Sequence, residues 1–404
     1  MWMTGYGFLE NSLRRPRNYN SCMLNLAAAH LAAPLLALLF SYAVTAALVR
    51  LGHREESRLA DNDLSGPQKF HERPVPRVGG IGIATGLWAA AFVMWFQDRS
   101  NLGLPILLML ACGLPVLLVG LAEDLTKRVS PRRRLLGTAV SAALVIAVFG
   151  FYIQRTDLAG LDWLVGFTAV AMAITVFAVV GVANSVNLID GFNGLASTCV
   201  AFMLLGLSAV AWVVGDHLVI AMALPAVAAI LGFLVWNFPR GLIFLGDGGA
   251  YFLGFYLAEL ALLLLSRNPQ VSPLFPLLLV MYPVFETVFS MYRRKVLKGR
   301  PMGQPDGSHL HSLIFRRFMR AGFASLGSEQ RVRRNSMTSP YLWALSMTAV
   351  VPAVVFWDNS TMLMACIVGF GLIYVSVYWR IVRFRAPRWL LFVSLLHRRR
   401  RSTV

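Results

Sequence analysis

Apolar runs of about 20 residues recur along almost the whole chain, and they constrain its fold more than any other feature. A run of this length, wound as a helix, crosses the roughly 30 Å hydrocarbon layer of a bilayer and satisfies its own backbone polar groups there. The sequence therefore predicts an all-α integral membrane protein with about eleven transmembrane helices. The expected spans are 24–50, 78–97, 103–122, 135–153, 163–183, 194–214, 217–237, 249–266, 273–291, 340–357 and 361–381.

Positive charge is distributed unevenly over the connections between these runs. This charge orients the chain by the positive-inside rule, which places the N-terminus outside and the C-terminus in the cytoplasm. The net charge of +18 thus reflects topology and contact with anionic lipid of the inner leaflet, and nucleic-acid binding is not expected. Most of the 37 Lys and Arg residues lie on the predicted cytoplasmic connections, at 51–77, 123–134, 184–193, 238–248, 292–339 and beyond 382.

Two short segments flank a single expected membrane domain at 23–383. Residues 1–22 are polar and lack the apolar core and cleavage site of a signal peptide. We expect them to be either a disordered segment or a non-native extension from an upstream start codon. Residues 384–404 mix aromatic and aliphatic side chains with clustered arginines. This composition predicts a basic amphipathic helix on the inner leaflet, with a solvated tail as the alternative.

Five polar stretches lie at the ends of the apolar runs that are predicted to be cytoplasmic. Carboxylates beside hydrocarbon are costly and indicate a functional site by default. Scattered helix caps would not need to converge on one side of the membrane, so the sequence predicts one site on the cytoplasmic face. The stretches are 69–80, 120–128, 184–195, 244–254 and 292–317.

The adjacent carboxylates Glu123 and Asp124 end the third run, and Lys127 follows them. On a continued helix Asp124 and Lys127 would share a face, so an ion pair is one interpretation. The other is a base or metal-linked acid beside a cation that holds phosphate. We favour the second interpretation, because two carboxylates at a membrane boundary are costly to keep.

Amide and carboxylate side chains recur at helical spacing at the end of the fifth run, as Asn184, Asn187 and Asp190. Helix capping accounts for one such residue, but not for three that are followed by Gly191 and Gly194. Glycines allow the backbone to approach a ligand closely. The pattern therefore suits a nucleotide or a hydrated divalent cation.

Two further stretches carry groups that suit phosphates. Asp247 in "GDGG" resembles a phosphate or Mg²⁺ turn, with an ordinary turn as the alternative, because Mg²⁺ takes one or two carboxylates and binds water and phosphate oxygens besides. His309 and His311 follow a basic run that includes Arg293. No Cys or His cluster completes a zinc site there, so we expect an anion clamp. Together these parts predict transfer of a phosphoryl group from a soluble nucleotide to a lipid-borne acceptor.

In this order, the same stretches resemble the polyprenyl-phosphate N-acetylhexosamine-1-phosphate transferases of glycosyltransferase family 4. That family includes the WecA-like initiators of O-antigen synthesis and the MraY translocases. The resemblance covers about residues 66 to 320. It rests on His71 with Pro76, Gly79 and Gly80, the acidic pair with its lysine, "NxxNxxDGxxGL", "GDGG", "PVFETVFSMYRR" and the His-x-His loop.

The resemblance implies a reaction. UDP-N-acetylhexosamine and undecaprenyl phosphate would give UMP and an undecaprenyl-diphosphate-sugar, which initiates O-antigen or another surface polysaccharide. It implies an Mg²⁺-dependent enzyme of the bacterial inner membrane, with Mn²⁺ as a substitute metal and a homodimer as one assembly. Asp247 would bind the metal together with Asn187, and Asp124 would act as the base beside the lipid phosphate.

The other roles follow from the same motifs. Asp190 and Asn193 would line the uridine and diphosphate pocket, and the two histidines would clamp the sugar diphosphate. The expected catalytic residues are Asp124, Glu123 and Asp190, and the expected substrate-binding residues are Lys127, Asn184, Asn193, His309, His311, His71 and Arg293.

Three positions depart from the family pattern. Glu123 and Glu286 stand where the family has Asp, and Ser312 stands where a further histidine is usual. The longer side chain argues against Glu123 as a direct metal ligand. The triple histidine of the MraY branch is also missing, which makes a MurNAc-pentapeptide donor the less favoured alternative. A transporter would need polar residues at mid-depth, whereas most of these lie at one interface.

Overall fold

The computed structural model describes residues 19–52, 60–61, 75–97, 102–297, 299, 307–319 and 328–383. Most of these residues are helical, and one short antiparallel ladder pairs Ala60 with Pro76. The expectations for His71 and for the tail at 384–404 lie outside the described residues. So does most of the segment 1–22, of which only the last four residues are described, within the first helix.

The elements follow one another along the chain with short connections between most of them. They are α2 (Tyr19–Gly52), β1 (Ala60–Asp61), β2 (Val75–Pro76), α3 (Gly79–Gln97), α4 (Gly103–Cys112), α5 (Leu114–Thr126), α6 (Pro131–Phe149), α7 (Ala159–Val165), α8 (Thr168–Ile189), α9 (Leu195–Val214), α10 (His217–Asn237), α11 (Gly246–Arg267), α12 (Leu274–Leu279), α13 (Met281–Tyr292), the π-helical turn η2 (Arg293–Leu297), α14 (Leu310–Ile314), the π-helical turn η3 (Phe315–Met319), α15 (Ser328–Val355) and α16 (Ser360–Val382).

The predicted all-α, multi-pass membrane class is confirmed, whereas the predicted number of eleven spans is not. Within the described residues, eight helices are long and apolar enough to cross a bilayer, and a ninth span results if α4 and α5, bent by 43°, count together. The two remaining predicted runs correspond to α6, which has three arginines in its first turn, and to the broken pair α12 and α13. The count of eleven and the orientation of the termini stay predictions.

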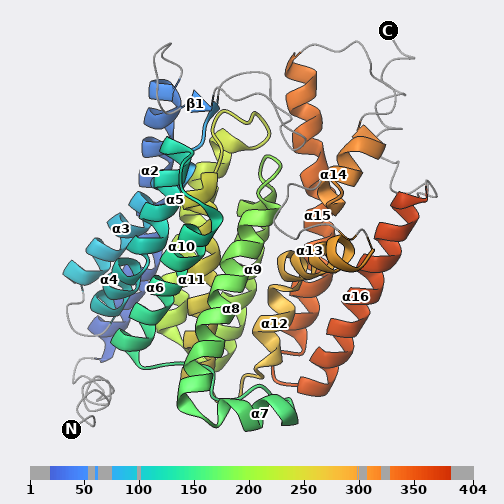
Figure 1. Ribbon diagram of the computed structural model, residues 1–404. Helices are drawn as coiled ribbons and strands as arrows, with labels where there is room; N and C mark the ends of the chain where they lie inside the picture. The colour runs from blue at the N-terminus through green and yellow to red at the C-terminus, as the bar shows by residue number, and fades with distance from the viewer. Residues whose placement is uncertain are drawn as a thin grey trace, which may run out of the picture.

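The helices run between two ends of the molecule (Figure 1). α7 lies at one end. The other end, which we call the site end, carries β1, the turn 190–194 after α8, the N-terminus of α11, and α14. The described parts of all five polar stretches reach the site end, so the alternation of helices brings together residues far apart in the sequence.

Helix α11 is the centre of the bundle, with 89% of its apolar window buried. Its first turn is glycine-rich because two neighbouring helices approach its backbone closely. A Cβ added at Gly80 of α3 would lie 2.4 Å from the Cα of Gly249, and one at Gly120 of α5 would lie 2.5 Å from the Cα of Gly248. Only glycine permits this approach, and it brings the end of α5 against the N-terminus of α11.

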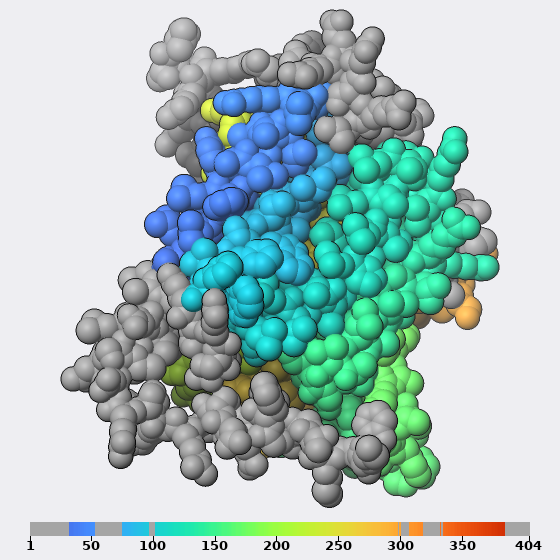
Figure 2. Space-filling view, turned by 90° about the vertical axis from the view of Figure 1, so that its left-hand side faces the viewer, coloured from blue at the N-terminus to red at the C-terminus, as the bar shows by residue number. Residues whose placement is uncertain are grey.

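Large apolar side chains cover the periphery of the bundle. Phe177 on α8 is 78% exposed and Trp212 on α9 is 73% exposed. Figure 2 shows one lateral face, where the blue α2 meets the cyan α3; Phe96 on α3 is another exposed aromatic residue. Monomeric soluble proteins rarely expose large contiguous apolar patches, so these surfaces are the ones that lipid covers.

Candidate active site

Two groups of polar side chains lie at the site end, and we name them by their chemistry. The carboxylate cluster comprises Asp124, Asp190 and Asp247 with Arg77, Arg134 and Asn187. The histidine cluster comprises His309 and His311 with Glu286, Arg293, Arg294, Tyr374 and Tyr378.

Asp124 caps the N-terminus of α11 from the end of α5. Its Oδ1 accepts the backbone N–H of Asp247 and its Oδ2 accepts that of Gly248, both at 2.9 Å. The first N–H groups of a helix have no partner within the helix and carry its positive dipole end, so a buried carboxylate is stabilised there. Asp124, predicted as a base, therefore uses both oxygens to position the first turn of α11, which contains Asp247.

Asp247 is surrounded by cations and by one amide. Its carboxylate accepts hydrogen bonds from Arg134 and from Nδ2 of Asn187, the latter at 3.1 Å, and Nη2 of Arg77 lies 3.7 Å away. Sequence reasoning missed both arginines. The sequence held a signal for Arg134. An arginine in the first turn of a helix interacts unfavourably with the helix dipole, so its position there indicates a partner elsewhere in the fold.

Asp190 ends α8, and its backbone N–H donates to the carbonyl of Asn187 at 3.1 Å. Among the described residues, no side chain or backbone group donates a hydrogen bond to its carboxylate. Burial raises the pKa of Asp190 to about 7, and the nearby Arg77 opposes this rise. Asp190 is thus the carboxylate of the cluster whose oxygens are left to accept a proton or a hydrogen bond from a ligand.

Glu123 and Lys127 belong to the turn that follows α5. The Oε2 of Glu123 accepts the backbone N–H of Val129 at 2.7 Å. α5 stops at Thr126, and Lys127 adopts a left-handed conformation with φ 56°. The helical continuation that would have aligned Asp124 with Lys127 is therefore absent, although the charge of Lys127 still acts on Asp124.

Two amides of α8, Asn184 and Asn187, contact α11. Asn184 accepts a hydrogen bond from the hydroxyl of Tyr251 at 3.0 Å, and the Arg134 guanidinium lies over that tyrosine ring, 5.7 Å from its centroid. Asn187 lies one turn further on and reaches Asp247. The helical spacing predicted for these two amides holds, and it directs both of them toward α11.

Asn193 faces the other way, into a contact with α15. Its Nδ2 donates to the hydroxyl of Ser336 at 3.0 Å, and its backbone N–H donates to Oδ1 of Asn335 at 2.9 Å. Trp343 of the same helix donates to the carbonyl of Gly194 at 3.0 Å. Asn193 therefore anchors the turn after α8, and no described contact supports its predicted place in a nucleotide pocket.

The donor set around Asp247 fits Mg²⁺ in kind. Mg²⁺ binds one or two carboxylates and completes an octahedral shell with water and phosphate oxygens. Asp247 supplies the carboxylate, and the Asn187 side chain supplies an amide that can turn its oxygen to a cation. Among the described residues no group of three or more His, Cys, Asp or Glu side chains is placed to hold one metal ion together, so these residues offer no site for a metal with many protein ligands.

The histidine cluster is built on Glu286 of α13, which is fully buried. Its Oε1 lies 3.0 Å from Nδ1 of His309 and accepts the backbone N–H of Leu310 at 3.2 Å. Its Oε2 accepts the hydroxyl of Tyr374 at 2.6 Å. Helices α13, α14 and α16 thus meet at one carboxylate, and this explains why an acidic residue stands in "PVFET".

The two histidines stack on each other and meet the turn after α8. The ring centroids of His309 and His311 are 5.2 Å apart with planes 10° apart, and His311 packs edge-on against Phe192 at 5.4 Å. Burial, together with the neighbouring His309, lowers the pKa of His311 to about 3. His311 is therefore neutral at physiological pH, and its predicted part in an anion clamp stays a prediction.

Arg293 is committed to the protein interior. Its Nη1 donates to the carbonyl of Ser308 at 2.7 Å and to the hydroxyl of Tyr378 at 3.0 Å. Its side chain is nearly completely buried, whereas that of Arg294 is half-buried. These contacts tie the chain before the histidines to α16.

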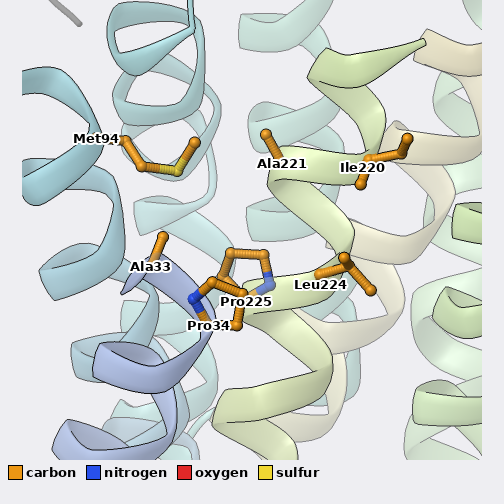
Figure 3. A pocket seen from close by; sticks show the side chains of 7 residues that line it. All are labelled: Ala33, Pro34, Met94, Ile220, Ala221, Leu224 and Pro225. Carbon is orange, nitrogen blue, oxygen red and sulfur yellow. The ribbon is translucent and has the colours of Figure 1, made fainter. Parts of the chain in front are cut away.

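A shallow apolar crevice, too small to hold a water molecule, lies between α2, α3 and α10 (Figure 3). Pro34, Met94 and Pro225 are among the residues that line it, and all seven are apolar. The crevice therefore offers no group for chemistry.

Comparisons with known proteins agree with the motifs. A family model described as "Glycosyl transferase family 4" matches residues 106–265. A relative from Bacillus subtilis (strain 168), named "Probable undecaprenyl-phosphate N-acetylglucosaminyl 1-phosphate transferase", is 31% identical over 256 residues, which cover 60% of this chain and 66% of the relative.

Two further relatives are named "Undecaprenyl-phosphate alpha-N-acetylglucosaminyl 1-phosphate transferase". The protein from Escherichia coli (strain K12) is 28% identical over 267 residues, covering 64% of this chain and 69% of the relative. The protein from Thermotoga maritima is 29% identical over 255 residues, covering 62% and 71%. The chain thus spans about two thirds of the length of these relatives, and the resemblance predicted from the motifs is confirmed.

Proposed function

Because the chain is a relative of the undecaprenyl-phosphate N-acetylglucosaminyl 1-phosphate transferases of glycosyl transferase family 4, we propose that it carries out that reaction. The donor is a UDP-N-acetylhexosamine, with N-acetylglucosamine as the sugar. The acceptor is undecaprenyl phosphate, and the products are UMP and an undecaprenyl-diphosphate-sugar that initiates a surface polysaccharide. The convergence of three carboxylates and two arginines at the site end of a membrane bundle carries this proposal.

Asp247, with Asn187 beside it, would hold Mg²⁺, which would neutralise charge on the nucleotide diphosphate. Arg134 and Arg77 already neutralise Asp247, and both are groups that bind phosphate oxygens well. When substrate phosphates enter, these arginines have a second set of anions to bind. The cluster thus supplies the positioning and charge neutralisation on which phosphoryl transfer mainly depends.

Asp190, rather than Asp124, is proposed as the proton acceptor for the attacking lipid phosphate. A general base needs an oxygen within hydrogen-bond reach of the proton that it removes. Both oxygens of Asp124 accept backbone N–H groups of α11, whereas the Asp190 carboxylate accepts none from the described residues. Asp124 then acts through Asp247, because it fixes the helix turn that carries it.

The site end is proposed to face the cytoplasm of a bacterium, across the inner membrane. UDP-sugars are soluble, so the polar stretches must lie on the side that supplies them. The excess of Lys and Arg on the connections at this end agrees with the positive-inside rule and with contact with anionic lipid.

Purified protein in detergent tests the proposal, with undecaprenyl phosphate, Mg²⁺ and a panel of UDP-sugars, and with UMP release as the measurement. We expect UMP release that requires both the lipid and Mg²⁺. The matched control for the variant Asp247→Asn is Asp216→Asn. Asp216 is also a buried carboxylate that binds an arginine, and it caps a helix at the opposite end of the bundle. Folded protein that releases no UMP with any donor would refute the proposal.

A further inference from the structure

The turn after α8 carries Asp190 at its start, and α15 binds the other half of the turn. The backbone N–H of Asn193 donates to Oδ1 of Asn335 at 2.9 Å, and the carbonyl of Asn193 accepts the hydroxyl of Ser339 at 2.6 Å. Asn335 and Ser339 lie about one helical turn apart, and each is at most 1% exposed. Both backbone polar groups of Asn193 are therefore satisfied by buried side chains of α15.

Gly194, the next residue, is bound from two helices. Its backbone N–H donates to Oδ1 of Asn237 at the end of α10, at 2.6 Å, and its carbonyl accepts the indole N–H of Trp343 of α15 at 3.0 Å. Gly194 has a left-handed conformation with φ 69°, and the chain enters α9 directly after it. The Trp343 ring also packs on Phe238, with the ring centroids 4.9 Å apart. Contacts with α10 and α15 thus fix the path of the chain between Asp190 and α9.

The same two helices contact the connection that leads to Asp247. The hydroxyl of Ser336 on α15 donates to the carbonyl of Pro239, which lies between α10 and α11. Asn237, which binds the turn after α8, also donates through Nδ2 to the carbonyl of Ile243 at 2.7 Å. Buried hydrogen bonds therefore join the turn after α8 to the connection that precedes α11.

The polar side chains at the site end of α15 are not explained by helix packing. Asn335, Ser336 and Ser339 are buried, whereas the buried residues further along α15 are apolar apart from Ser346. Burial of a polar side chain costs free energy unless it is hydrogen-bonded, and apolar side chains would pack the helix at a lower cost. The backbone that these side chains bind supplies the reason for them. α15 lies outside residues 106–265, which the family model matches.

We propose that the α15 side chains which bind this backbone hold the turn after α8 so that Asp190 faces the attacking lipid phosphate. The positioning residues are Asn335, Ser339 and Trp343. The inference rests on the proposed function, in which Asp190 is the proton acceptor. Since none of the described residues donates a hydrogen bond to the Asp190 carboxylate, the backbone of the turn sets where that carboxylate lies. A displacement of about 1 Å can cost a reaction about 10²-fold in rate.

Ser339→Ala and Asn335→Ala each remove one group that binds the backbone of Asn193. Each should lower kcat by about 10-fold and the double variant by about 10²-fold. KM for UDP-N-acetylglucosamine should change by no more than about 3-fold, because the affected group acts in the transition state and not in substrate binding. Ser208→Ala is the matched control and should leave kcat unchanged. Ser208 is also a buried serine, but its hydroxyl donates to the carbonyl of Leu204 within α9.

Two further variants preserve the packing of α15. Ser339→Thr keeps the hydroxyl that donates to Asn193 and should keep most of the wild-type kcat. Trp343→Phe removes the N–H that donates to Gly194 but keeps an aromatic ring against Phe238, and it should lower kcat with KM unchanged. A rise in KM in place of the fall in kcat, or a wild-type kcat in both Ser339→Ala and Trp343→Phe, would overturn the proposal.

A mutant cycle with Asp190→Asn separates positioning from a general structural role. If α15 acts through Asp190, addition of Ser339→Ala to Asp190→Asn should lower kcat by less than about 2-fold, because the two residues then act on one step. A loss as large as in the wild-type background would show that Ser339 acts independently of Asp190 and would overturn the proposal.

Hydrogen–deuterium exchange of the full-length protein in detergent tests the hold on the turn without an activity assay. In the double variant of Asn335→Ala with Ser339→Ala, peptides that cover the turn after α8 should exchange faster than in the wild type, and Ser208→Ala should exchange as the wild type does. Exchange that stays at the wild-type rate in the double variant would overturn the proposal. Faster exchange in the double variant, with no UMP released by the wild type, would instead refute the proposed function and leave the contact between α15 and the turn in place.

Discussion

The carboxylate cluster and the histidine cluster lie at the same end of the molecule but satisfy their polar groups differently. In the histidine cluster, both oxygens of Glu286 and both ring nitrogens of His309 have partners within the protein. In the carboxylate cluster, Asp247 is held by arginines that also suit phosphate, and Asp190 has no hydrogen bond to its carboxylate among the described residues. The hydrogen bonds of the histidine cluster fix the geometry of its side chains, whereas the side chains of the carboxylate cluster can exchange their partners for a substrate. We therefore assign the chemistry to the carboxylate cluster and the positioning to the histidine cluster.

The largest expected effect is that of Asp247→Asn. It removes the carboxylate proposed to hold Mg²⁺ while keeping the size of the side chain. We expect kcat to fall by about 10³-fold, since a single group that stabilises transition-state charge is worth about 10² to 10³. Measurement of UMP release against Mg²⁺ concentration checks this, and near-normal turnover would remove Asp247 from the metal site.

Asp190→Asn should lower kcat by about 10²-fold, which is typical for loss of a general base. Because no described hydrogen bond to its carboxylate is lost, the thermal unfolding midpoint should stay near that of the wild type. Asp124→Ala, by contrast, should lower the thermal unfolding midpoint, because loss of a helix cap costs about 0.5–2 kcal/mol of stability. If Asp124→Ala lost activity with an unchanged midpoint, Asp124 would be the base instead.

Tyr374→Phe tests the fixed character of the histidine cluster. It removes the hydroxyl that donates to Oε2 of Glu286 and leaves the other contacts of that carboxylate in place. A hydrogen bond to a charged group contributes about 1.5–3 kcal/mol, so the free energy of unfolding should fall by about that amount. We expect KM for the UDP-sugar to change only a few-fold, and a larger loss of kcat than of stability would contradict the positioning role.

The smallest effect is a pH dependence that originates in His311. Its pKa is lowered from 6.5 to about 3 in the folded protein, so between these values the unfolded chain binds a proton that the folded chain does not. Stability therefore falls as the pH falls below 6.5, by about 2 kcal/mol at pH 5. His311→Phe keeps an aromatic ring against Phe192 but cannot titrate, so its unfolding midpoint should depend less on pH. Parallel pH profiles for the two proteins would contradict this.

The fold class was predictable because its cause is local. Runs of about 20 apolar residues form helices wherever lipid surrounds them, and each predicted run is helical over most of its length in the structure. The break within the run at 103–122 was not predicted, although Pro115 follows Gly113 there and lacks a backbone N–H. The length of a run indicates a span, but the bend depends on how α5 packs against α11.

The motif residues of the site were predictable from the sequence, but the side chains that bond to them were not. Asn187, Asp190 and Asp247 stand in short motifs whose chemistry can be read directly. Arg134 was missed because its partner Asp247 lies 113 residues away in the sequence, and only the packing of α6 beside α11 brings them together. The same holds for Asn193, whose contacts with α15 span more than 140 residues and anchor the turn after α8.

The most direct test of the central claim is the ratio of the two products made by purified protein. UDP-N-acetylglucosamine labelled in the sugar, with undecaprenyl phosphate and Mg²⁺, allows UMP and labelled lipid to be measured in the same reaction. Transfer of a sugar phosphate to the lipid predicts equal amounts of UMP and of undecaprenyl-diphosphate-sugar, and neither product with Asp247→Asn. UMP that forms without labelled lipid, or without undecaprenyl phosphate, would contradict the account.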